Sequence, residues 1–181
     1  MVSVGDPVRA GLIASLAHPG GNVTGPSALG PDLAPKRLQL LQQVIPSLVR
    51  VALLFNPNNV SNIITRDEIE TATRDLGVNL IQVEASSVPD LDTNLRGLLS
   101  QRPDALIATI DAVTLSQLHE VIDFLESNRI PTMFSDREYV LARRVSSLAF
   151  AMFAAIRLAS SEKHDLDQRR VCVCPSIGFE R

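Results

Sequence analysis

The chain has 181 residues, of which 45% are hydrophobic and 20% are charged, and its formal net charge is −3. This composition is typical of a globular domain of ordinary size and excludes a disordered chain. The negative charge, the lack of Trp and the single Tyr argue against a nucleic-acid surface. The apolar run 148–156 is too short to span a bilayer. We therefore expect neither a nucleic-acid partner nor direct insertion into a membrane.

The first predicted element is a helix over residues 6–18. Asp6 precedes a Pro, which suits the cap and first turn of a helix, because Pro lacks only an N–H that would be unpaired there. Three apolar residues recur on one face of this helix: Val8, Leu12 and Leu16. The Pro-Gly-Gly stretch at 19–21 then ends the helix and leads into an extended segment that contains Thr24.

From residue 34 onward, helical stripes alternate with short apolar runs. The runs at 49–55, 78–83, 104–110 and 131–134 are typical of strands, and helical periodicity precedes the first and separates the rest. We expect Asp90 to cap the third helix of this series and Thr114 with Gln117 to form a capping box at the fourth. The alternation predicts an α/β fold with a parallel sheet and flanking helices.

Parallel strands joined by right-handed crossovers end at one edge of a sheet, and ligands of open α/β sheets bind there. Asn56, Pro57 and Asn58 follow the first strand, residues 84–86 the second, and Asp111 the third. The asparagine loop is either a strand-ending turn or a ligand loop, since an Asn beside a helix N-terminus suits a carboxylate. Asp111 is either an ordinary loop or cap residue or a partner for a ligand ammonium group.

The fourth strand is followed by a charged stretch, 136–139, which reads either as a solvated loop or as part of the site. Arg137 lies in this stretch and could meet a ligand. Tyr139, the only Tyr in the chain, has an apolar face with a polar tip and suits covering a ligand, although aromatic side chains are often simply packed.

The sequence contains no motif for a metal site, a hydrolase nucleophile or a phosphate-binding loop. The three His residues, at 18, 119 and 164, have no partner at metal-binding spacing. There is no Gly-x-Ser-x-Gly elbow and no glycine-rich phosphate loop. Cys172 and Cys174 are too close together for a stapling disulfide and too few for a zinc site. We expect no metal, no cofactor and no enzymatic activity.

Several short motifs, in the same order and at similar spacing, resemble one protein family. They are Asp6-Pro7-Val8, Asn22-Val23-Thr24-Gly25, Lys36-Arg37-Leu38, Val51 to Asn58, Leu76-Gly77-Val78, Pro103 to Leu106, and Arg129 to Tyr139. Together they cover about residues 2 to 142 and resemble the substrate-binding proteins of ABC transporters, of the type associated with tryptophan and tyrosine.

The resemblance implies a type I periplasmic-binding-protein fold, in which two lobes close on a small solute and deliver it to a permease. It implies that residues 1–30 are a remnant of the first lobe and its hinge crossover, and that 31–142 form the second α/β lobe. The ligand would then meet Asp6, Thr24, Asn56, Pro57, Asn58, Asp111, Arg137 and Tyr139. With one lobe absent, we expect this chain to bind ligand weakly or not at all.

The resemblance breaks after residue 142. Arg143-Arg144 stands where the family normally has Gly-Gly, and residues 143–181 read as an atypical helical or disordered tail. Our hypothesis is that this tail is read in a shifted frame or otherwise replaced. Translating the adjacent frame of the locus tests it, since the absence of a family-like continuation there contradicts the idea.

The resemblance also implies a periplasmic location or a lipid anchor for the intact protein. The opening residues lack a basic region followed by an apolar core, so the chain as written is expected to stay in the cytoplasm. Two alternatives to a binding protein remain open: a small α/β enzyme or phospho-acceptor domain that uses Asp111, and a truncated product with no independent function.

Overall fold

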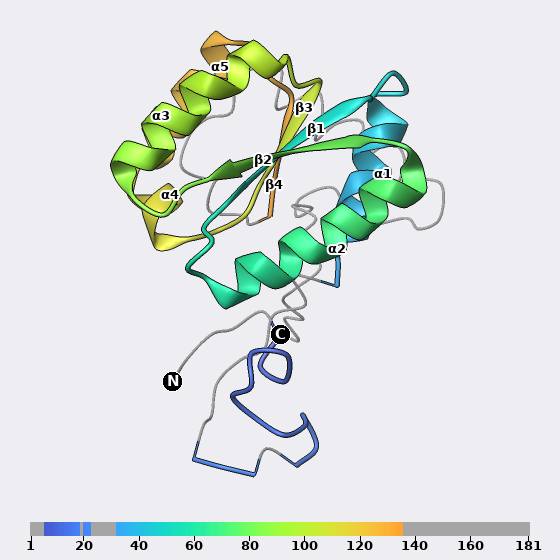
Figure 1. Cartoon of the computed structure of the whole chain (residues 1–181), viewed down its shortest axis with the longest axis vertical. Helices are drawn as coiled ribbons and strands as arrows, with labels where there is room; N and C mark the ends of the chain where they lie inside the picture. The colour runs from blue at the N-terminus through green and yellow to red at the C-terminus, as the bar shows by residue number, and fades with distance from the viewer. Residues whose placement is uncertain (1–5, 19, 23–31, 136–181) are drawn as a thin grey trace, which may run out of the picture.

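The computed structural model describes residues 6–18, 20–22 and 32–135, drawn in colour in Figure 1. Thr24, Arg137, Tyr139 and the tail from 143 onward lie outside the described residues. The elements, in chain order, are α1 (Ala34–Val44), β1 (Arg50–Phe55), α2 (Val60–Leu76), β2 (Asn79–Glu84), α3 (Val88–Leu98), the 3-10 turn η1 (Leu99–Gln101), β3 (Ala105–Ala108), α4 (Ala112–Ser116), α5 (Leu118–Ser127) and β4 (Thr132–Phe134).

The four strands form one parallel sheet in the order β2-β1-β3-β4. Val51 pairs with Leu80 on one side and with Ala105 on the other, so β1 lies inside the sheet. All β1 residues after Arg50 are buried, which explains why this run is apolar without alternation. The predicted α/β fold with a parallel sheet is confirmed. Most strands begin or end one or two residues away from the predicted positions.

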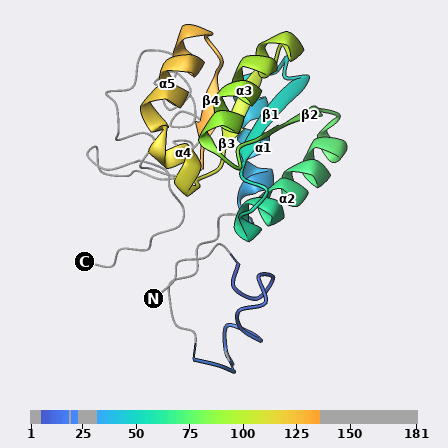
Figure 2. The same cartoon turned by 60° about the vertical axis from the view of Figure 1, so that its left-hand side comes forward.

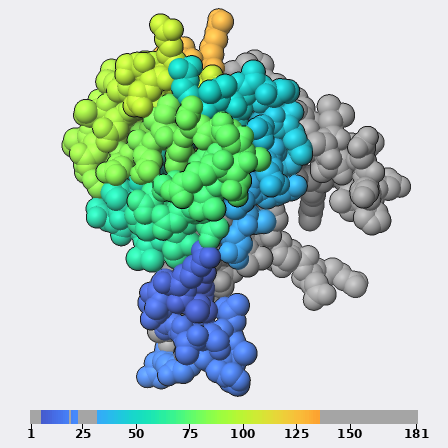
Figure 3. Space-filling model, turned by 45° about the vertical axis from the view of Figure 1, so that its right-hand side comes forward, coloured from blue at the N-terminus to red at the C-terminus, as the bar shows by residue number. Residues whose placement is uncertain are grey.

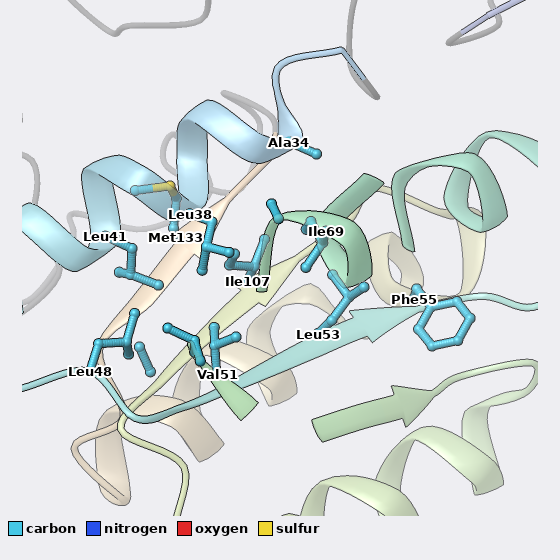
Figure 4. Packing of buried hydrophobic residues seen from close by; sticks show 13 residues of the cluster. Ala34, Leu38, Leu41, Leu48, Val51, Leu53, Phe55, Ile69, Ile107 and Met133 are labelled. Carbon is cyan, nitrogen blue, oxygen red and sulfur yellow. The ribbon is translucent and has the colours of Figure 1, made fainter. Parts of the chain in front are cut away.

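Helices cover both faces of the sheet, as Figures 1 and 2 show: α1 and α2 lie on one face, and α3 and α5 on the other. Side chains of β1 alternate between the two cores, since Leu53 belongs to the first and Leu54 to the second. Figure 4 shows the first core, where Leu38 and Leu41 of α1 meet the sheet. Because helices cover both faces of the sheet, the ends of the strands are where the sheet remains open.

Two of the predicted helix caps are wrong in detail. The side chain that caps α3 belongs to Ser87, whose Oγ accepts a hydrogen bond from the Asp90 backbone N–H at 3.3 Å, so Asp90 lies in the first turn. The capping box of α4 joins Asp111 and Thr114, not Thr114 and Gln117. Gln117 instead separates α4 from α5. In both places the capping residue lies three positions earlier in the chain than predicted.

The predicted N-terminal helix is also wrong. Asp6 does cap a turn, since its Oδ1 accepts hydrogen bonds from the N–H groups of Val8 and Arg9, each at 3.0 Å. The turn does not continue, and Gly11 adopts a left-handed φ of 70°. The stripe is exposed, with Leu16 at 69% of its surface accessible, and Figure 3 shows this blue segment projecting from the α/β unit. A short helix with no surface to pack against has little to hold it.

Candidate functional site

The neighbouring strands β1 and β3 lie at the point where the strand order reverses. The chain leaves β1 through α2 toward β2 on one side, and leaves β3 through α4 and α5 toward β4 on the other. In open α/β sheets the crevice outside the carboxyl ends of two such strands is the usual ligand position. The loops that follow β1 and β3 therefore begin at the usual ligand position of this fold.

Asp111, after β3, joins these two loops through its carboxylate. Its Oδ1 accepts from Asn56 Nδ2 at 2.8 Å and from the Val113 N–H at 2.9 Å, and its Oδ2 accepts from Asn59 Nδ2 at 3.0 Å. Burial alone would raise the pKa of Asp111, but the hydrogen bonds from Asn56, Asn59 and the α4 backbone outweigh it and lower the pKa below its ordinary value. The group is therefore a carboxylate at neutral pH.

The two asparagine side chains are fixed at both ends. Asn56 Oδ1 accepts from the Asn58 N–H at 2.9 Å, and Asn59 Oδ1 accepts from the Ser61 N–H at 3.0 Å, the second bond capping α2. An amide that offers its nitrogen to a carboxylate and its oxygen to a backbone N–H has only one sensible orientation. The loop from 56 to 59 is held in one shape, with Pro57 half-buried and Asn58 exposed at its tip.

A second layer lies beneath this loop. The buried Asn62, on α2, accepts at Oδ1 from the Asn56 N–H at 3.1 Å and from Thr109 Oγ1 at 2.6 Å. Its Nδ2 donates to the Ile110 carbonyl at 3.1 Å. We call the set Asn56, Asn59, Asn62, Thr109 and Asp111 the amide junction. Sequence reasoning missed Asn62 and Thr109; the available signal was an Asn in the first turn of α2, on the face that the sheet buries.

The exit of β2 is organised differently. Ser86 Oγ donates to Asp90, and Asn94 Nδ2 donates to the Glu84 carbonyl at 2.9 Å. These bonds are exposed and short-range, and the Ser86 hydroxyl is the main cause of a lowered pKa at Asp90. The described contacts of this exit serve the start of α3.

A cationic side chain from α1 reaches the exit of β4. Arg37, in the first turns of α1, donates from Nη2 to the Ser135 carbonyl at 3.3 Å. Within the described ranges, the buried Oγ of Ser135 has no hydrogen-bond partner. Arg37 stands in one of the recognised motifs, but no sequence pattern assigned it to the site.

Asp6 is held within its own turn, and the segment that carries it contacts α2. Its carboxylate bonds the turn backbone and lies 3.6 Å from Arg9 Nε, and Arg9 in turn pairs with Glu68. The structure thus brings together Asn56, Pro57, Asn58 and Asp111 of the predicted set and places Asp6 in a separate segment.

The described part of the chain holds neither a cluster of metal ligands nor a membrane-spanning helix. In residues 6–18, 20–22 and 32–135 no three His, Cys, Asp or Glu side chains gather as metal ligands would. Over the same ranges, no helix combines the length and apolar character that crossing a bilayer requires.

Comparison with known proteins identifies the family of this chain. Residues 1–154 match the family described as ABC transporter substrate binding protein, which extends past residue 142, where the recognised motifs stop. A curated relative, the "Tyrosine-binding protein" of Clostridioides difficile strain R20291, is 28% identical over 137 residues, covering 75% of this chain and 39% of the relative. The chain thus spans well under half the length of that relative.

Solved structures share the fold. A conserved domain protein from Vibrio cholerae gives a TM-score of 0.69 at 21% identity, covering 90% of this chain and 55% of the other. An ABC domain in complex with L-Trp from Streptococcus pneumoniae gives 0.70 at 19% identity, covering 91% and 57%. In both cases this chain spans a little over half of the solved one.

Proposed function

The chain belongs to the ABC transporter substrate-binding protein family, and we propose that its described α/β unit supplies one of two surfaces that hold a small amino-acid-like solute. The family binds substrates and is not a family of enzymes. The observation that carries the proposal is the amide junction, because it fixes a polar loop at the switch point of the sheet before any ligand arrives. A site whose groups are already held in place loses less entropy when it binds.

The chemistry of the junction suits the two charges of an amino acid. Asp111 keeps its negative charge at neutral pH and attracts an ammonium group. The first turn of α2, which follows Asn59, carries the positive end of a helix dipole and favours a carboxylate. Asn58, exposed at the tip of the loop, is the side chain best placed to meet the ligand directly.

The names of two relatives support a class of substrate. One is named a tyrosine-binding protein, and one solved structure holds L-Trp. We propose an aromatic amino acid or a close analogue for this chain as well. The full predicted contact set remains Asn56, Pro57, Asn58 and Asp111 with Asp6, Thr24, Arg137 and Tyr139.

The alternative of an enzyme or phospho-acceptor that uses Asp111 is less consistent with the geometry. Three N–H groups hydrogen-bond the two oxygens of Asp111, which makes the carboxylate a weaker nucleophile, although Oδ2 keeps a lone pair that can accept a hydrogen bond from an ammonium group. Those bonds fit a residue that organises a loop.

We propose further that residues 31–142 act as one lobe, joined to the other by residues 1–30, and that a permease receives the solute from the closed pair. The family is typically extracellular or periplasmic, and we propose that location for the intact protein. Because half of the contacts would come from elsewhere, the 181 residues alone should bind with a dissociation constant of about 1 mM or weaker, roughly −4 kcal/mol.

Saturation-transfer NMR with L-tryptophan on the full chain tests this, since the method detects millimolar binding. We expect a signal that free L-tyrosine competes away and that Asn58→Ala reduces by several-fold. Asn79→Ala is the matched control, because Asn79 is exposed at the start of β2, at the opposite edge of the sheet. Absence of any signal, or turnover or phosphorylation that depends on Asp111, would count against the proposal.

A further inference from the structure

Arg37 and Ser135 meet at the exit of β4, although 98 residues separate them. Arg37 lies in the first half of α1, is half-buried, and donates from Nη2 to the carbonyl of Ser135, the residue directly after β4. This contact places a guanidinium group at the same edge of the sheet as the amide junction. A guanidinium group carries five N–H donors in a planar fork, the geometry that suits a carboxylate.

The neighbouring strand exits thus carry opposite charges. Asp111 follows β3, and Arg37 reaches the end of β4, which pairs with β3 in register from Leu106 to Ala108. Paired strands lie about 4.8 Å apart. A zwitterionic amino acid carries its ammonium and carboxylate groups on one carbon, so it needs an anion and a cation in one region, and these adjacent strand exits carry one of each.

Ser135 adds a second, independent observation. Its Oγ is buried and has no hydrogen-bond partner among the residues that the structure describes. Buried hydroxyl groups in folded proteins are nearly always bonded, and an exception calls for an explanation. A ligand oxygen at this exit would accept the hydrogen bond that the hydroxyl has to give.

We propose that the Arg37 guanidinium and the Ser135 hydroxyl, rather than the first turn of α2, bind the carboxylate of the amino-acid ligand, opposite an ammonium group that faces Asp111. This inference rests on the proposed function, and it names the part of the ligand that each strand exit recognises. The bond from Arg37 to the Ser135 carbonyl then has a clear role: it fixes the position of the guanidinium group.

A double comparison of protein and ligand tests the proposal. L-Tryptophan and L-tryptophan amide differ in the carboxylate alone, and at about pH 6 both amines are protonated, because an α-amino group ordinarily has a higher pKa. Binding of each ligand is measured by NMR titration on the full chain, the Arg37→Gln variant and the Lys36→Gln variant. Lys36 is the matched control, since it is the exposed cation next to Arg37 on the same helix.

Arg37→Gln is expected to weaken binding of L-tryptophan by about 10-fold or more, the usual effect of losing a hydrogen bond between charged groups. Binding of the amide should change by less than about 2-fold, well inside the effect of one ordinary hydrogen bond. Lys36→Gln should alter neither ligand. Arg37→Lys, which keeps the charge but loses the fork, should lie between the wild-type chain and Arg37→Gln.

Equal weakening of both ligands by Arg37→Gln would overturn the inference, because it would mean that Arg37 only supports the fold. If the unchanged chain binds neither ligand, the proposed function itself fails, and this inference fails with it. The two failures are distinguishable, since only in the first does the unchanged chain bind.

Ser135→Ala separates the hydroxyl from the fold. Because its Oγ has no described partner to lose, the substitution should not lower the midpoint of urea unfolding. It should still weaken L-tryptophan binding by about 5-fold, the effect of one ordinary hydrogen bond. A lowered midpoint with unchanged affinity would contradict the assignment of Ser135.

Discussion

The exits of β1 and β3 and the exit of β2 use the same kinds of residue in different ways. The first pair is joined by the amide junction, whose side-chain bonds link residues 47 to 55 positions apart and include buried side chains. At the exit of β2, Ser86, Ser87 and Asn94 bond groups no more than ten residues away, mostly at the exposed surface. Asn, Ser and Asp side chains alone therefore do not mark a binding site.

The bonds at the two sites differ in burial and in the distance along the chain between the bonded residues. A local cap satisfies one helix end, and water can replace it at small cost. A buried bond between distant loops has no such substitute, so it holds the two loops in one relation. This contrast predicts that substitutions at the amide junction cost far more stability than substitutions of the same chemistry after β2.

The largest effect is expected from Asn62→Ala. It removes two acceptor contacts and one donor contact in the buried layer and leaves the Asn56 N–H and the Ile110 carbonyl to find other partners, while the Thr109 hydroxyl keeps its bond to the Leu54 carbonyl. We expect a loss of about 3 kcal/mol in the free energy of unfolding, measured by urea denaturation. Asn94→Ala removes one exposed amide after β2 and should cost about 0.5 kcal/mol or less. Equal costs would break the contrast between the exits.

A smaller effect is expected from Asp111→Asn, with a defined pH dependence. At pH 7 the new amide must turn one N–H toward Asn56 or Asn59, and the loss should be about 2 kcal/mol. The pKa of Asp111 is lowered in the folded chain, so its contribution is present above the ordinary pKa and is lost as the pH falls through the folded value.

The difference in unfolding free energy between the wild-type chain and Asp111→Asn should therefore shrink as the pH drops below about 4. Urea denaturation at stepwise lower pH measures it. Asp75→Asn is the control, since it removes the same charge from an exposed side chain of α2. A difference that grows toward acid would show that Asp111 is not held as a carboxylate.

The smallest effect is expected after β2. Ser87→Ala removes the α3 cap, whose single bond is long at 3.3 Å, and should cost about 1 kcal/mol or less. Ser86→Ala, at an exposed neighbour, should leave the unfolding midpoint unchanged within error. The helical circular-dichroism signal, followed through urea unfolding, gives both values. A cost at Ser87 that equals the cost at Asn62 would mean that the two edges are built alike.

Much of this architecture could be predicted from the sequence. The four apolar runs and the helical stripes between them follow from the two periodicities of secondary structure, and the parallel sheet follows from their alternation. The rule that ligands bind at strand ends then singled out Asn56 and Asp111. The structure shows these two residues bonded to each other.

The bonds within the amide junction could not be predicted. They depend on the strand order, which brings β1 beside β3 although β2 lies between them in the chain. The capping box was misplaced for a local reason, since Thr114 has the required three-residue spacing both to Asp111 and to Gln117, and the structure uses Asp111. Local patterns carry no information on which distant loops become neighbours.

The helix predicted for the N-terminal segment is wrong for a different reason: its local signals are present, but no surface covers it. Its cap at Asp6 is real and its apolar spacing is regular, yet Val8 and Leu12 are 41% and 40% exposed. A pattern indicates which face a helix would bury, but the helix forms only where another surface accepts that face. Stripes of equal quality in α3 and α5 fold because the sheet covers them.

The span of the amide junction along the chain also orders events in time. Asn56 and Asn59 are synthesised long before Asp111, which lies 55 and 52 residues further on. On the ribosome the first strand and its helix are complete while the carboxylate that locks their loop has yet to emerge, and long-range closures of this kind form late. A nascent chain therefore has no closed amide junction until β3 has emerged and paired with β1.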